Sequence, residues 1–111
     1  MQVPQEAILL RIFLGESDKH EGKLLHEAVV LRARKAGLAG ATVTRAIMGF
    51  GKTSRLHTTK ILRLSEDLPI VIEIVDAPEK IRAFLPVLEG IMGSGLVTLE
   101  EIKVCRYGDG A

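Results

Sequence analysis

The stretch Pro69-Ile-Val-Ile-Glu-Ile-Val-Asp76 is the strongest strand signal in the sequence and the starting point for its fold. Its isoleucines and valines are β-branched, and such side chains favour an extended backbone. Asp76 is placed to cap a following helix, and Glu79 three residues later completes a pattern like a capping box. Pro86 predicts a kink or a short first segment in that helix, because an interior proline costs about 3 kcal/mol. The helix itself is predicted from an apolar stripe of Ile81, Phe84, Leu85 and Leu88.

The segments before this stretch predict a strand, a loop and a helix. Residues 7–14 alternate apolar side chains with period two, which predicts a first strand. Residues 15–22 form a polar loop bounded by glycines, and residues 23–36 predict a helix from apolar positions three and four apart. Gly37 stands where a helix C-cap belongs. The start of the helix is expected to be capped by Glu16, Ser17 and Asp18.

The remaining segments supply two more strands and a long connection. Residues 41–48 are rich in β-branched side chains and predict a second strand. Residues 49–60 lack a clean period and are expected to be a mobile, functional excursion, with 61–64 leading back as a strand. Residues 90–95 form a glycine-rich break, and residues 97–107 predict the last strand.

The order of these elements predicts an α+β fold of the ferredoxin-like βαββαβ type. One domain over residues 1–111 is expected, in which two helices cover one face of a four-stranded antiparallel sheet. The other face would stay uncovered, with Leu9, Phe13 and Val71 on it. Apolar side chains on an open face predict a subunit interface there.

The overall composition excludes several classes of function. The 111 residues are 47% hydrophobic and 26% charged, with a net charge of +1, which gives no electrostatic reason to expect nucleic acid as a partner. Aromatic side chains are few, so stacking surfaces for nucleic acid are scarce. No segment approaches the roughly 18–20 apolar residues of a membrane span. The N-terminus lacks the features of a signal peptide, and a lone Cys105 points to no disulfide, so a cytoplasmic protein is expected.

A candidate phosphate-binding loop lies at the end of the second strand. Ala46-Ile-Met-Gly-Phe-Gly-Lys-Thr53 fits a loosened P-loop pattern, and Asp76 would then be the magnesium ligand of an ATPase. The chain is too short for the large parallel sheet that a P-loop needs, which argues against this interpretation. A second interpretation is that the amides around Gly49 and Gly51 form an anion nest. A third is a flexible hairpin tip.

Several motifs resemble those of the PII signal-transduction proteins. Gly37-Leu-Ala-Gly-Ala-Thr-Val43 followed by Gly49-Phe-Gly-Lys52 is similar to the strand and loop base of those proteins. Gly15-Glu-Ser-Asp18, Leu64-Ser-Glu-Asp-Leu-Pro-Ile-Val71 and Phe84-Leu-Pro86 resemble more closely an uncharacterised family of short PII-like proteins. The resemblance covers residues 7–107.

The resemblance implies a homotrimer with a regulatory role and no catalytic residue. An adenine nucleotide (ATP, ADP or AMP) would lie in clefts between subunits, and residues 49–60 would act on a partner, either a membrane transporter or channel or an enzyme. The base would be contacted by Gly40, Ala41 and Thr42. The phosphates would be contacted by Gly49, Phe50, Gly51, Lys52, Gly93, Ser94 and Gly95, and Arg106 would complete the site. The loop after the second helix lacks the phosphate-binding lysine of PII proteins, and residues 49–60 lack their modified tyrosine.

Two other classes of function remain open. The loop of residues 15–22 carries Asp18, His20 and Glu21, which suit a small enzyme or a metal-handling protein. No spacing of His20, His26 and His57 predicts a closed metal site, so no metal ligand is expected. Ser54 and His57 lack an acid to orient them, and Cys105 is expected to be a small buried side chain. The plainest alternative is a structural adaptor whose assembly alone matters.

Overall fold

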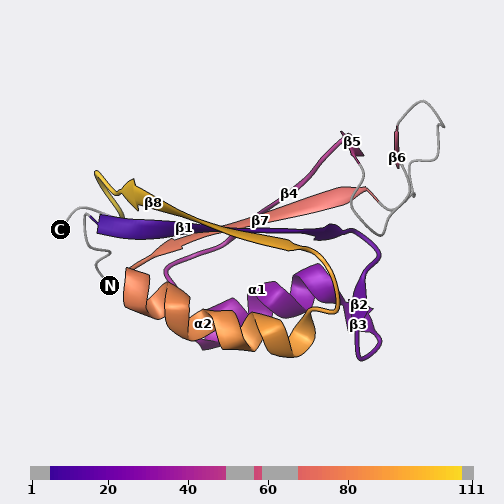
Figure 1. Cartoon of the computed structure of the whole chain (residues 1–111), viewed down its shortest axis with the longest axis horizontal. Coiled ribbons are helices and arrows are strands. Elements are labelled where there is room, and N and C mark those ends of the chain that lie inside the picture. Colours follow the sequence, from indigo (N-terminus) through magenta and orange to yellow (C-terminus); the bar gives the residue numbers. More distant parts are fainter. Residues whose placement is uncertain (1–5, 50–56, 59–67, 109–111) are drawn as a thin grey trace.

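The computed structural model describes residues 6–49, 57–58 and 68–108. Four strands form an antiparallel sheet in the order β4-β7-β1-β8, where β1 is Glu6–Gly15, β4 is Thr42–Arg45, β7 is Pro69–Asp76 and β8 is Leu96–Lys103. Helices α1 (Leu25–Lys35) and α2 (Pro78–Ile91) lie against the same face of this sheet, below it in Figure 1. The predicted ferredoxin-like α+β fold is therefore confirmed.

The core lies between the sheet and the two helices. The central strands β1 and β7 alternate buried and half-buried residues with period two, as the sequence predicts. Each large apolar side chain fully buried here contributes about 1.5–3 kcal/mol. The strands contribute Ile8, Leu10, Ile12, Leu14, Ile70, Ile72 and Ile74 to this core, and the helices contribute Leu25, Val29, Ala33, Ile81, Phe84, Leu88 and Ile91.

Helix α1 ends as predicted and begins differently. Gly37 has φ +79, its amide donates to the carbonyl of Arg34, and the amide of Leu38 donates to that of Ala33, which is the Schellman arrangement. The N-cap residue is Leu24, and its side chain makes no cap hydrogen bond. The amide of Leu25, the first residue of the helix, donates to the backbone carbonyl of Asp18 at 2.7 Å, so Asp18 contacts the start of the helix through its main chain. The Asp18 carboxylate accepts from the Gly15 amide at 2.9 Å instead, so it closes the preceding turn.

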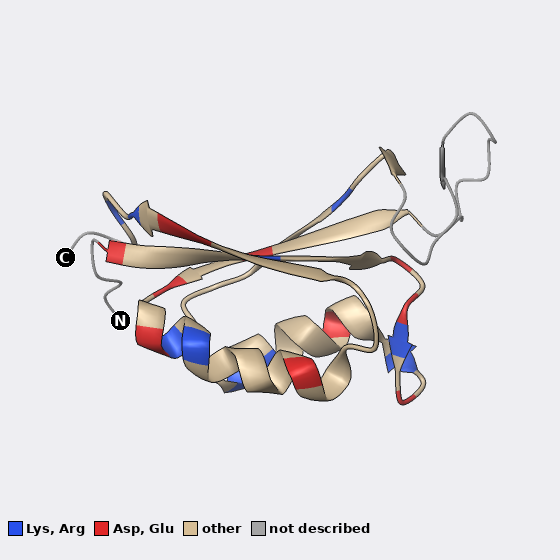
Figure 2. Cartoon of the chain, in the orientation of Figure 1, with Lys and Arg blue, Asp and Glu red and all other residues tan. Residues whose placement is uncertain are grey.

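The predicted polar loop of residues 15–22 contains a small hairpin. Strands β2 (Lys19–His20) and β3 (Lys23–Leu24) pair antiparallel. Glu21 and Gly22 connect them with φ of 51° and 80°, and two consecutive positive φ values are typical of a tight hairpin turn. Lys19 and Lys23 give this hairpin the blue patch beside the helices in Figure 2.

The predicted strand over residues 41–48 is interrupted. Strand β4 stops at Arg45, and the amide of Ala46 donates to the carbonyl of Pro69 at 2.8 Å. Strand β5 (Met48–Gly49) then pairs with β6 (His57–Thr58) in a separate two-stranded sheet. The predictions of mobility over 50–60 and of a strand over 61–64 fall mostly outside the described residues. So do Phe50, Gly51 and Lys52 of the predicted site.

Three further predictions about the second half need correction. The N-cap of α2 is Ala77 rather than Asp76. The helix runs without a break through Pro86, so the predicted short first segment is wrong. Strand β8 ends at Lys103, and Cys105 after it is exposed rather than buried.

The uncovered face of the sheet has a charged centre. The Nε of Arg11 lies 2.8 Å from Glu73, and its Nη1 lies 3.3 Å from Glu100. The hydrogen bond to Glu73 raises the pKa of the Arg11 guanidinium above its ordinary value, so this group stays charged. The partly exposed Leu9, Phe13 and Val71 share this face with the charged group. Whether subunits meet on it stays a prediction.

Candidate functional site

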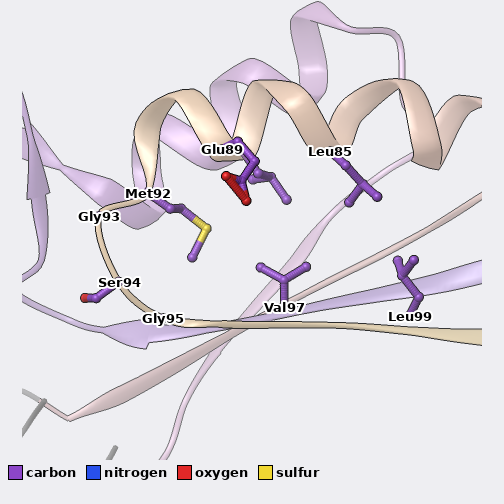
Figure 3. A pocket seen from close by; sticks show the side chains of 9 residues that line it. Leu85, Glu89, Met92, Gly93, Ser94, Gly95, Val97 and Leu99 are labelled. Atoms are coloured by element: carbon purple, nitrogen blue, oxygen red, sulfur yellow. The ribbon is translucent and has the colours of Figure 1, made fainter. Parts of the chain in front are cut away.

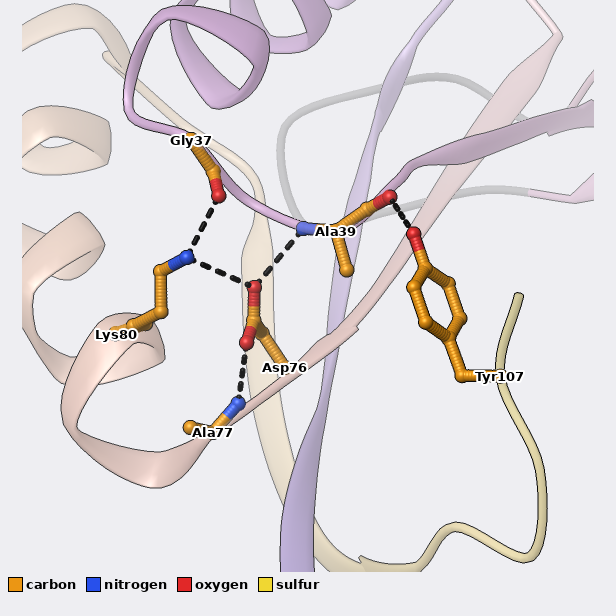
Figure 4. A network of polar contacts seen from close by, with 6 residues as sticks. All are labelled: Gly37, Ala39, Asp76, Ala77, Lys80 and Tyr107. Carbon is orange, nitrogen blue, oxygen red and sulfur yellow. Dashed lines mark hydrogen bonds and ion pairs between the residues drawn. The ribbon is translucent and has the colours of Figure 1, made fainter. Parts of the chain in front are cut away.

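The segment between α1 and β4 is held by a buried carboxylate. Asp76 at the end of β7 is only 1% exposed. Its Oδ2 accepts from the amide of Ala39 at 2.9 Å, and its Oδ1 accepts from the amide of Ala77 at 2.6 Å. Lys80 lies beside it, with Nζ 3.7 Å from Oδ2 and 2.7 Å from the carbonyl oxygen of Gly37 (Figure 4). These contacts fix the backbone that leads into residues 40–42.

The segment that follows β8 contacts the same backbone from the other side. The hydroxyl of Tyr107 donates to the carbonyl of Ala39 at 2.6 Å (Figure 4). Arg106 precedes this tyrosine and is exposed. The structure therefore brings four predicted residues to one end of the sheet, namely Gly40, Ala41, Thr42 and Arg106.

The other described residues of the predicted site lie at the opposite end. Gly49 in β5 lies against Pro69, because a Cβ at position 49 would be 2.8 Å from the Cγ of that proline. Gly95 has φ +125, and its Cβ would be 2.8 Å from the carbonyl oxygen of Phe13. Both glycines are thus required by packing within the chain. Gly93 and Ser94 are exposed and lie next to Gly95.

Two groups of predicted residues are therefore separated within one chain. Gly95 precedes the first residue of β8, and Arg106 follows its last residue by three positions. Strand β8 has 8 residues, so its ends lie about 25 Å apart at the rise of roughly 3.3 Å per residue. Asp76 and Glu101 both pair with Ile8, which places the Ala39 contact near the far end of β8. One phosphate group cannot contact both groups of the same chain.

A groove opens between α2 and the edge strand β8. It has a volume of about 460 Å³, and Val97 and Leu99 of β8 face α2 across it (Figure 3). Both belong to an edge strand and are 38% and 46% exposed. Its remaining lining residues are Leu85, Leu88, Glu89, Met92, Gly93, Ser94 and Gly95. The loop assigned to phosphate contact thus forms one wall of a mostly apolar groove.

The alternative sites find less support in the geometry. The Nε2 of His20 lies 3.8 Å from Glu21, and Asp18 is engaged in its own turn. Within residues 6–49, 57–58 and 68–108, no three His, Cys, Asp or Glu side chains are grouped so that they could hold a metal ion. The ATPase interpretation is wrong, because the sheet is antiparallel and Asp76 is occupied by backbone amides. No helix among the described residues is long and apolar enough to cross a membrane.

Three residues of this arrangement were missed by sequence reasoning. Asp76 was assigned to a helix cap or, in the ATPase interpretation, to magnesium, and Lys80 and Tyr107 were assigned no role. Their contacts join positions 37, 43 and 68 residues apart. The available signal was an acidic residue at the end of an apolar strand, since a buried carboxylate needs hydrogen-bond donors.

Comparison with known proteins gives matches along most of the chain. A model of the family DUF190, described as "Uncharacterized ACR, COG1993", matches residues 7–104. A UPF0166 protein of Aquifex aeolicus is 46% identical over 96 residues, which cover 86% of this chain and 90% of that protein. A UPF0166 protein of Methanocaldococcus jannaschii is 38% identical over 102 residues, which cover 91% of this chain and 94% of that protein.

Solved structures of PII-like proteins share the fold. CPII, a nitrogen regulatory PII-like protein from Thiomonas intermedia, aligns with a TM-score of 0.62 and 23% identity over 91% of this chain and 90% of that chain. A protein described as PII-like and signaling, from Thermus thermophilus, aligns with a TM-score of 0.64 and 22% identity over 94% and 93% of the two chains. The similarity at this identity is one of fold.

Proposed function

This chain belongs to the DUF190 family, and we propose that it is a cytoplasmic, PII-like regulatory protein that binds an adenine nucleotide without turning it over. The nucleotide lies in clefts between the subunits of a homotrimer. Residues 49–60 signal the nucleotide-bound state to a partner protein, which is a transporter, a channel or an enzyme. Most of these residues lie outside the described residues.

The separation of the two groups of site residues carries this proposal. The segment of residues 40–42 with Arg106 forms one half-site, and Gly49 with residues 93–95 belongs to the other. Because the length of β8 separates them within a chain, a ligand that contacts both must lie between two copies. The half-sites are at opposite ends of the sheet, so each copy supplies a different half to each neighbour. Such a head-to-tail arrangement closes into a ring when the rotation between copies allows it.

Two further observations agree with the proposal. CPII, which shares the fold, was crystallised bound to ADP, AMP and bicarbonate. The uncovered sheet face carries Leu9, Phe13 and Val71 with a charged centre, and such a mixed surface suits contact with further copies of the chain.

Titration calorimetry combined with light scattering tests the proposal. The chain is titrated with ADP, AMP and ATP, each with and without bicarbonate, and its mass is measured in the same buffer. Saturable binding of at least one nucleotide by a trimer supports the proposal. A monomer of 12.1 kDa, or a trimer that binds none of the three nucleotides, contradicts it. Release of phosphate from bound ATP would contradict the absence of turnover.

A further inference from the structure

The peptide groups at Ala39 are held from two sides. Its N–H donates to Asp76, which is 1% exposed and belongs to the core side of the sheet. Its carbonyl accepts from Tyr107, which is 46% exposed and belongs to the segment after β8. Figure 4 shows the two contacts on opposite sides of the segment. Asp76 therefore holds the N–H of Ala39, and Tyr107 holds its carbonyl.

The contact with Tyr107 also orients the next residue. In a planar trans peptide, the carbonyl of one residue and the N–H of the next point in opposite directions. A carbonyl of Ala39 held toward Tyr107 therefore directs the N–H of Gly40 away from it. Gly40 is exposed, and no atom of the described residues lies within 4 Å of where its Cβ would be. A ligand has room to approach this oriented donor closely.

The same hydrogen bond restrains the backbone next to Arg106. Strand β8 ends at Lys103, and residues 104–107 have no regular secondary structure. An arginine in such a segment loses conformational entropy when it binds a phosphate, and this loss weakens binding. The hydroxyl of Tyr107 ties the segment to Ala39 one residue after Arg106. Part of the ordering is thus completed before a ligand arrives.

We propose that Tyr107 is a positioning residue of the nucleotide site: its hydrogen bond to Ala39 holds Arg106 beside the Gly40–Thr42 segment, so that both form one preorganised half-site. The inference rests on the proposed function. Tyr107 itself need not touch the nucleotide, since it acts through the position of Arg106 and through the orientation of the Gly40 amide.

A double-mutant cycle tests this role. ADP affinity is measured by calorimetry for the parent, Tyr107→Phe, Arg106→Gln and the double variant, with Lys19→Gln at the other end of the molecule as a control for loss of a surface charge. Loss of one hydrogen bond predicts that Tyr107→Phe weakens binding about three- to tenfold. This loss should be smaller in the Arg106→Gln background, where only the effect through the Gly40 amide remains, because coupled residues are not additive. Unchanged affinity in Tyr107→Phe, or the same loss in both backgrounds, overturns the proposal.

Amide exchange followed by NMR separates this inference from the proposed function. The Ala39 amide, which donates to Asp76, should exchange several-fold faster in Tyr107→Phe than in the parent, because its segment is then held from one side only, while the amide of the core residue Ile72 is unchanged. If the parent binds no ADP, the proposed function fails, and the exchange data alone decide whether Tyr107 positions this segment. Equal exchange at Ala39 in parent and variant overturns the positioning role whether or not ADP binds.

Discussion

Asp76 and Ala39 lie 37 positions apart in the sequence and are joined by a hydrogen bond of 2.9 Å from the Ala39 amide to the buried carboxylate. The same carboxylate accepts from the Ala77 amide at the start of α2. One side chain therefore connects the end of β7, the start of a helix and the backbone that leads into the proposed base-contacting segment.

Replacing this carboxylate should weaken the fold. Asp76→Asn keeps the shape of the side chain but replaces one acceptor oxygen with an NH₂ donor, which faces a backbone amide. A buried donor left without an acceptor costs about 1–3 kcal/mol. Urea unfolding followed by circular dichroism should show a loss of this size in the free energy of unfolding. Glu79→Gln in the exposed first turn of α2 is the matched control and should change it little. Equal stability of Asp76→Asn and the parent would contradict the role given to Asp76.

Gly93 and Gly95 lie in the connection between α2 and β8, and replacing each with alanine should change stability by different amounts. Gly95→Ala forces an L residue to φ +125 and places a Cβ 2.8 Å from the carbonyl oxygen of Phe13, so a loss of about 1–3 kcal/mol in stability is expected. Gly93→Ala meets no atom of the described residues within 4 Å and should cost less than about 1 kcal/mol. Thermal unfolding of both variants checks the difference. Equal losses would show that the backbone at Gly95 is not constrained as described.

Gly40→Ala should weaken ADP binding and leave the stability of the fold nearly unchanged. Its Cβ meets no described atom within 4 Å, so the unfolding temperature should stay close to that of the parent. A ligand that approaches the Gly40 amide would meet the added methyl group, and ADP affinity should fall about tenfold or more. Calorimetry and a thermal scan on the same preparation check both parts. Parent-like affinity would remove Gly40 from the site.

A pair of threonines on β4 tests contact with the base. Thr42 pairs with Glu73 and Thr44 with Val71, so both side chains share the uncovered face of the sheet. Thr42→Val removes a hydroxyl at nearly constant shape and should weaken ADP binding about three- to tenfold through the lost hydrogen bond. Thr44→Val makes the same chemical change one pleat further along and should leave affinity unaltered. Equal effects of the two changes on ADP affinity would contradict a specific contact between Thr42 and the base.

The uncovered sheet face should hold the subunits together. Phe13→Asp places a charge among the partly exposed apolar residues of this face, and burying an unpaired charge at an interface is strongly unfavourable. The variant should dissociate to a monomer of 12.1 kDa in light scattering. Leu31→Asp changes an apolar side chain that is 58% exposed on α1 and should leave the mass unaltered. A parent-like mass for Phe13→Asp would place the interface elsewhere.

Local sequence patterns predict most of the helices and strands of this fold. They do not predict the long-range contacts that position the residues of the proposed site. Strands β1 and β7 were predictable because burial on one face of a sheet imposes alternation with period two. The β2–β3 hairpin was missed because its strands have two residues each and Glu21 adopts a positive φ without a glycine signal. The break after Arg45 comes where the β4–β7 pairing reaches Pro69, which accepts from the Ala46 amide but has no N–H to donate in return.

The site was predicted in part for the same reason. The resemblance to PII proteins selected residues by motif. The predicted strand over residues 97–107 already separates Gly95 from Arg106, but the motifs could not show that the segment of Arg106 contacts the one that leads to Gly40. Asp76 and Tyr107 carry no local signal for their shared partner, because the carbonyl and amide of Ala39 are backbone groups that any residue would provide. Sequence patterns identify side chains more readily than the backbone groups that those side chains hold.

Complementation between two variants with weakened ADP binding tests most directly whether the site is shared between subunits. Arg106→Gln removes a cation from one proposed half-site. Lys52→Ala removes the cation that the resemblance to PII proteins assigns to the phosphates, three positions after Gly49 of the other half-site. Each change alone should weaken ADP binding about ten- to a hundredfold, as expected for a lost charge-assisted contact. Mixed oligomers, formed by unfolding and refolding the two variants together, contain some clefts in which the intact half-sites of two different chains meet.

These mixed oligomers should recover parent-like affinity in about one quarter of their clefts. Each cleft takes one half-site from each of two neighbouring chains in the ring, and in a random mixture each half-site is intact in about half of the chains. Mixtures of separately refolded variants are the control and should recover none. Absence of any high-affinity sites in the co-refolded sample, with the parent binding ADP under the same conditions, would contradict a site shared between subunits.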